Sequence, residues 1–153
     1  MNLQTTELII NIITFLIIAI FILAPFLTYF FLRKKIKIKK TLLRFGLFFL
    51  INTIIFGILT LLFTYWNEEM SKQIILNKFG FNSDGMNEVE YFQNVKPENK
   101  NRLKEIYESM FGIGWPLKAF FAFVIFSLPY NFLATLTLNI IEKIKRKKEL
   151  QIT

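Results

Sequence analysis

Three long runs of apolar residues dominate the pattern along the chain, at positions 8–32, 45–66 and 116–141. At about 1.5 Å of helix rise per residue, each run can cross a hydrocarbon core of about 30 Å. Polar residues are concentrated in the short flanks and in one longer loop between the second and third runs. The pattern predicts an all-α membrane protein, with three transmembrane helices in a small bundle and a helical extracytoplasmic cap between helices 2 and 3.

The alternation of apolar runs and polar flanks also predicts how the chain is divided. The predicted parts are an outer N-terminal tail (1–7), transmembrane helix 1 (8–32), a basic cytoplasmic hairpin (33–44), transmembrane helix 2 (45–66), an extracytoplasmic helical loop or cap (67–115), transmembrane helix 3 (116–141) and a basic cytoplasmic tail (142–153).

The distribution of charge predicts the orientation of these helices. Lysine and arginine gather after the first and third runs, whereas the 67–115 loop holds more acids than bases. Cytoplasmic flanks retain positive charge, and tryptophan favours the membrane interface, where Trp66 and Trp115 are expected. We therefore expect a multi-pass protein of the cell (inner) membrane, with its N-terminus outside and its C-terminus in the cytoplasm.

The net charge of +8 comes from bases beside the membrane, and this argues against a nucleic-acid partner. Bases next to a bilayer are expected to fix topology and to attract anionic lipid headgroups. The candidates for this role in the 33–44 hairpin are Arg33, Lys34, Lys35, Lys37, Lys39 and Lys40.

Small and polar residues recur at helical spacing within the apolar runs. In lipid such residues mark the faces where helices meet, because apolar side chains gain little from association there. Asn52 and Asn131 are expected at similar depth, where they can bond across helices. The residues predicted to pack helices, or to line a pore in the alternative interpretation, are Gly46, Asn52, Thr53, Gly57, Thr60, Thr64, Ser127 and Asn131. Pro129 predicts a kink in helix 3.

The 67–115 loop carries its own helix signals. A helix that either starts at Asn67 or simply continues the second apolar run should stop at Gly80. Asn87 should cap a short helix, and Pro97 should open another. This last helix has an apolar stripe, which is expected either to pack on the membrane surface or on the 67–79 helix, or to dock a protein partner. The stripe consists of Leu103, Ile106, Tyr107 and Met110.

The residue types present restrict the chemistry. The chain has neither cysteine nor histidine, which excludes disulfides, thiolate or imidazole metal ligands and histidine-based catalysis. The acids of the loop lack the spacing of a calcium-binding EF-hand. We therefore expect no catalytic, cofactor or metal site.

The expected function is that of a non-enzymatic accessory, assembly or immunity-type subunit that binds a protein partner through its extracytoplasmic loop. The alternative is a homo-oligomeric channel or transport element, lined by the small and threonine face of helix 2. This second function requires self-association, because three helices cannot enclose a wide path.

Overall fold

The computed structural model of the chain describes residues 2–33 and 41–152, with side chains for 2–32 and 42–144. Within these residues the secondary structure is entirely helical. The elements in chain order are α1 (Leu3–Arg33), α2 (Thr41–Tyr65), the π-helical η1 (Trp66–Met70), α3 (Ser71–Lys78), α4 (Glu88–Tyr91), α5 (Pro97–Glu108), α6 (Trp115–Ala122), the π-helical η2 (Phe123–Ser127) and α7 (Leu128–Ile152).

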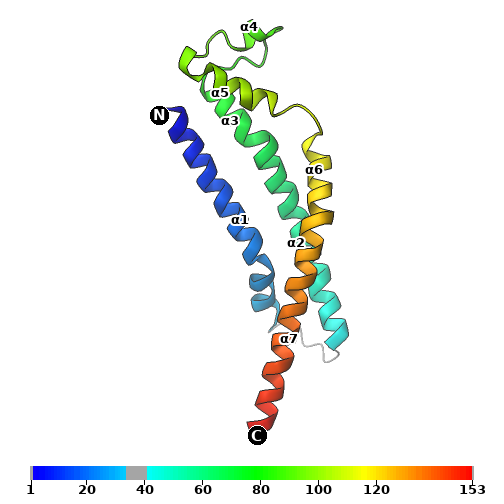
Figure 1. The fold of residues 1–153 in the computed structure, drawn as a ribbon. Helices are drawn as coiled ribbons and strands as arrows, with labels where there is room; N and C mark the ends of the chain where they lie inside the picture. The colour runs from blue at the N-terminus through cyan, green and yellow to red at the C-terminus, as the bar shows by residue number, and fades with distance from the viewer. Residues whose placement is uncertain (1, 34–40, 153) are drawn as a thin grey trace. The chain divides into compact units, whose positions relative to one another are not determined.

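Three helical stretches are long and apolar enough to cross a membrane: Leu3–Leu32, Leu42–Lys78 and Trp115–Ile144. They correspond to α1, to α2 with η1 and α3, and to α6 with η2 and most of α7, which can be followed by colour in Figure 1. The prediction of an all-α membrane protein with three long apolar helices is confirmed.

Helix α1 begins at Leu3, so residues 3–7 are its first turns where the sequence predicted an outer tail. The reason is an N-terminal cap supplied by Asn2. Its Oδ1 accepts hydrogen bonds from the backbone N–H of Thr5 at 2.8 Å and from the Thr5 hydroxyl at 2.6 Å. Asparagine in this position satisfies a backbone donor that the first helical turn leaves unbonded.

Helix α2 continues without a break through η1 into α3, and this stretch ends at a glycine. The N–H of Phe79 bonds to Ile75 O, and the N–H of Phe81 bonds back to Leu76 O at 3.0 Å. Between them Gly80 takes a φ of +88°, which side chains disfavour. This 6→1 hydrogen bond beside a left-handed glycine is that of a Schellman C-terminal cap, and the helix ends at the glycine where the sequence predicted its end.

A π-helical turn, η2, precedes Pro129 in the third membrane-span candidate. Proline cannot donate to the carbonyl four residues earlier, Ile125, and its ring crowds that carbonyl. Ile125 lies inside η2, so the widened turn falls where the proline disturbs the helical hydrogen bonding.

The chain divides into two compact units, and the boundaries between them fall within α1, α2 and α6. Unit 1 comprises Met1–Ile18 and Leu61–Ala119, and unit 2 comprises Ala19–Thr60 and Phe120–Thr153.

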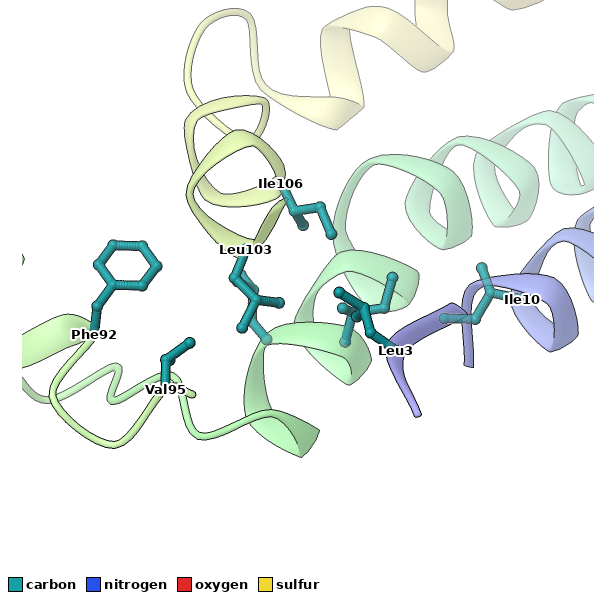
Figure 2. Close-up of a cluster of buried hydrophobic side chains, with 8 residues drawn as sticks. Leu3, Ile10, Phe92, Val95, Leu103 and Ile106 are labelled. Carbon is teal, nitrogen blue, oxygen red and sulfur yellow. The ribbon is translucent and has the colours of Figure 1, made fainter. Parts of the chain in front are cut away.

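Unit 1 has a hydrophobic core that joins the beginning of α1 to the loop helices (Figure 2). In Figure 2, Leu103 and Ile106 come from α5, Leu3 and Ile10 from α1, and Phe92 and Val95 from the segment between α4 and α5. The full cluster of buried residues is Leu3, Ile10, Ile75, Leu76, Phe92, Val95, Leu103 and Ile106.

Unit 2 is a three-helix bundle in which each helix contacts the other two. Phe21 of α1 meets Phe56 of α2 edge-on, with ring centroids 4.8 Å apart, and Phe56 is fully buried. The Tyr130 hydroxyl of α7 donates to Ile22 O of α1 at 2.8 Å, and Phe45 of α2 packs against Phe132 of α7. The predicted helical bundle is therefore present.

Candidate functional site

The apolar stripe of α5 forms part of the unit 1 core. Leu103 is 0% exposed and Ile106 is 7% exposed, while Tyr107 and Met110 are half-buried against the same cluster. The side chains that the sequence offered for docking are therefore occupied by the loop's own packing. Any partner of the cap, residues 67–115, has to contact other side chains as long as α5 stays in place.

An aromatic group lies beside this core. The ring of Tyr107 is 4.9 Å from that of Phe81 and 5.4 Å from that of Tyr91, measured between centroids. Burial raises the pKa of the Tyr107 phenol above its ordinary value, and the neighbouring Tyr91 adds to the rise. Aromatic packing of this kind fixes the orientation of the segment that follows α3.

Two exposed apolar side chains lie at the start of the short helix α4, one before its N-cap residue Asn87 and one in its first turn. Met86 is 91% exposed and Val89 is 77% exposed. The backbone that carries them is fixed by a reciprocal cap: the Asn87 side chain accepts from the Glu90 N–H, and the Glu90 carboxylate accepts from the Met86 N–H at 2.8 Å. The sequence predicted that Asn87 would cap a short helix. It gave no indication that the neighbouring Met86 and Val89 side chains would be exposed.

One ion pair connects α4 to α5. Lys104 Nζ donates to Glu88 Oε1 at 2.6 Å. The hydrogen bond and the charge of Lys104 lower the pKa of the Glu88 carboxyl, and Glu88 in turn raises the pKa of Lys104. Because both groups are exposed to solvent, screening by water leaves such a pair only a small contribution to stability. The apolar core therefore contributes more to holding the cap together than this pair does.

A polar pocket of about 340 Å³ lies within unit 1, between the beginning of α1 and helices α3 and α5. Arg102 bonds to Glu7 at 2.7 Å and to Glu105 at 2.9 Å, which raises the pKa of Arg102. Lys72 donates to the Ser109 carbonyl at 3.1 Å. The charged groups at the pocket are thus largely bonded to the protein itself. Its lining also includes Ile10, Asn11, Thr14, Asn67, Ser71, Ile75 and Ile106.

The small and threonine face of α2 is turned mainly toward neighbouring helices. Thr60 and Thr64 are buried, and Thr53 is half-buried. Gly57 is half-buried, and a side chain there would meet the Phe123 ring at 3.8 Å. Gly46, the first member of the stripe, is exposed and has nothing near it. The face thus lies inside its own chain over most of its length.

Within unit 2, a ladder of polar side chains links α2 to the last residue of η2 and to α7. The Thr60 and Ser127 hydroxyls are 2.7 Å apart, and Asn131 Nδ2 donates to Thr53 Oγ1 at 2.9 Å. Asn52 does not bond to Asn131 directly. Its Nδ2 donates to Thr135 Oγ1, which in turn donates to Asn131 Oδ1 at 3.2 Å.

A charged group in unit 2 was not anticipated from the sequence. Glu142 of α7 is paired with Arg44 of α2, and it accepts a hydrogen bond from the Tyr29 hydroxyl of α1 at 2.9 Å. Arg44 and Glu142 are 7% and 6% exposed. Each lies at the edge of an apolar run and has no local sequence signal of a partner. Helical spacing on α7 places Glu142 seven residues after Thr135, on the same face, which is the one indication that could have suggested it.

The basic residues predicted to contact anionic lipid fall outside the part of the chain whose side chains are described. They are Arg33, Lys34, Lys35, Lys37, Lys39 and Lys40. Among the residues that the structure does describe, no group of three or more acidic side chains is arranged to hold a metal ion. No protein family, curated protein or solved structure matches this chain.

Proposed function

We propose that this membrane protein is a non-enzymatic accessory, assembly or immunity-type subunit, which binds a protein partner at the outer face of the cell (inner) membrane. In this proposal the N-terminus and the 67–115 cap lie outside, and the C-terminus is cytoplasmic. The observation that carries it is the tip of the cap, where Met86 and Val89 are 91% and 77% exposed on a capped turn.

Two features of the tip favour a protein as the partner. Large apolar side chains held in solvent on a fixed backbone can be buried by a partner with little further loss of conformational entropy. The flanking charges, Glu88 and Glu90 on α4 and Lys104 on α5, form the polar rim that is usual around a small apolar contact.

Site-specific photocrosslinking in intact membranes tests this proposal. A benzophenone amino acid at position 86 or 89 should yield the same crosslinked protein product, and Val89→Asp should abolish the product formed from position 86. Lys100, an exposed position on α5, is the matched control and should yield little of it. Crosslinks to lipid alone, or an equal yield from position 100, would contradict the proposal.

The homo-oligomeric channel has less support. Its proposed lining residues Thr53 and Thr60 bond to Asn131 and Ser127 of the same chain, and Thr64 is buried. Phe56, which is fully buried, lies between Thr53 and Thr60 along α2 and interrupts a polar path. Single cysteines at positions 60 and 64 should therefore resist water-soluble thiol reagents. Rapid reaction at both would favour the channel.

A further inference from the structure

The direction of each hydrogen bond in the ladder between α2 and α7 can be derived from fixed acceptors. The carbonyl oxygen of Phe49 accepts from the Thr53 hydroxyl at 2.8 Å and from Asn131 Nδ2 at 3.2 Å. A backbone carbonyl can only accept, so the nitrogen of the Asn131 amide must face Phe49 and Thr53. The oxygen of that amide is consequently directed to Thr135.

The orientation of Asn131 determines the orientation of Asn52. Asn131 Oδ1 requires a donor, and the Thr135 hydroxyl supplies it at 3.2 Å. Having given its hydrogen to Asn131, Thr135 Oγ1 acts as an acceptor for Asn52 Nδ2 at 3.4 Å. Turning the Asn52 amide over would bring two acceptors together. Asn52 Oδ1 is therefore the end of the chain of bonds.

Among the side chains that the structure describes, Asn52 Oδ1 has no hydrogen-bond partner, although the residue is only 1% exposed. Burying a carbonyl-type oxygen without a donor is destabilising, because the oxygen gives up its hydrogen bonds to water and gains none in return. Asn52 lines a chamber in unit 2 of about 10 Å³, whose walls also carry polar groups from all three helices. The polar residues of this chamber are Tyr29, Arg44, Asn52, Thr135, Asn139 and Glu142.

We propose that this chamber is a binding site for a single water molecule, which donates a hydrogen bond to Asn52 Oδ1. A buried water needs at least about 10–15 Å³ and two to four polar partners, and the chamber is at that limit. Besides Asn52, the Arg44–Glu142 pair and Asn139 supply donors and acceptors. The water connects the polar ladder of α2 and α7 to the charged group at Glu142.

Water fits the chamber better than a small cation. Arg44 and Glu142 carry opposite charges and are paired, so the site is close to neutral. An added cation would bring an extra unit of charge into a membrane helix bundle, where charge is costly. A neutral donor satisfies Asn52 Oδ1 without that cost.

Radiolytic footprinting in ¹⁸O-labelled water tests the site in the full-length protein in lipid nanodiscs. Hydroxyl radicals formed from a bound water oxidise the side chains beside it even when bulk solvent cannot reach them. Phe48, which lines the chamber and is 4% exposed, should incorporate ¹⁸O several-fold faster than Phe56. Phe56 is the matched control, since it lies on the same helix and is 0% exposed but does not line this chamber.

Two variants separate the water from general loosening of the bundle. Asn52→Leu removes the acceptor and should reduce the labelling of Phe48 to the level of Phe56. Thr135→Val removes the other bond of Asn52 but leaves Oδ1 in place, so the labelling of Phe48 should persist. Equal labelling of Phe48 and Phe56 in the wild type would overturn the proposal. If Phe48 were labelled less in sodium chloride than in choline chloride, a bound sodium ion would be occupying the chamber. That result would overturn the proposal of a bound water.

Discussion

Individual polar side chains matter most where they are buried among apolar helices. Thr60 illustrates this: its hydroxyl donates to Phe56 O at 2.7 Å, so its oxygen accepts the hydrogen of Ser127. In lipid the apolar side chains of α2 and α7 gain little by meeting, and such bonds contribute directly to association. The small residues of α2 then act as packing residues with defined partners.

The Thr60–Ser127 bond should be measurable as a coupling energy. Thr60→Val and Ser127→Ala each remove the bond, and in a double-mutant cycle the two effects should be non-additive by roughly 0.6–2 kcal/mol. Steric-trap or denaturant unfolding in bicelles provides the measurement. Thr137→Val is the control, because its hydroxyl is exposed and bonds only within α7, and it should show no coupling to Ser127. Strict additivity for Thr60 and Ser127 would mean that the bond contributes nothing.

The Glu88–Lys104 pair predicts a pH dependence of the cap. Because the pKa of Glu88 is lowered in the folded state, its contribution to stability is present above the ordinary carboxyl pKa and is lost as the pH falls through the lowered value. In Lys104→Gln, an NMR titration should find the Glu88 pKa returned toward its ordinary value. Lys96→Gln should leave it unchanged. An unshifted Glu88 in the wild type would contradict the pair.

At the scale of elements, the end of α3 determines where the cap begins. The Schellman cap turns the chain at Gly80, so that Phe81 returns to the unit 1 core beside Tyr107. The turn requires glycine for two reasons: its φ is +88°, and a Cβ would lie 2.6 Å from the backbone oxygen of Asn94. Backbone oxygens cannot move aside as a flexible side chain can.

Gly80→Ala should therefore destabilise the cap by more than the roughly 1–2 kcal/mol that a left-handed conformation costs a non-glycine residue. Amide hydrogen exchange of Phe81, whose N–H bonds to Leu76 O, reports the loss locally. Gly46→Ala is the control, since it is helical and its Cβ would meet nothing within 4 Å. This control should stabilise the protein by about 0.5–1 kcal/mol. Unchanged protection of Phe81 in Gly80→Ala would show that the turn tolerates a side chain.

At the scale of the whole molecule, the sequence was most informative where structure depends on local pattern. Apolar run length identified the three long helices, and Gly80, Asn87 and Pro97 marked helix ends because caps involve neighbouring residues. The Arg44–Glu142 pair could not be read in this way, since it joins residues nearly one hundred positions apart. The periodicity of apolar residues along a helix gives no information about partners so far apart in the sequence.

The same limit applies to the docking stripe of α5. Its spacing showed an apolar face, but not which surface would cover it. The structure buries Leu103 and Ile106 together with Leu3 and Ile10 of α1, a segment that the sequence pattern had divided between a tail and a membrane span. The exposure of Met86 and Val89 was also not predicted. An apolar side chain stays exposed only when no other part of the fold covers it, and the local sequence does not show this.

The proposed orientation can be tested on the intact protein, because the chain has no cysteine of its own. A membrane-impermeant maleimide should label Val89→Cys, in the cap, on intact cells. Lys143→Cys, which is exposed on α7, should react only after the membrane is permeabilised. The opposite pattern would reverse the topology and place the cap in the cytoplasm.

The union of Leu3 and Leu103 in one core has a consequence for synthesis of the protein. Ribosomes add about 5–20 residues per second, so α1 exists for several seconds before α5 leaves the ribosome. Throughout that interval the apolar surface around Leu3 and Ile10 lacks its eventual cover. The unit 1 core can therefore form only late in synthesis, and a chain that ends before α5 would leave the surface around Leu3 and Ile10 without its partners from α5.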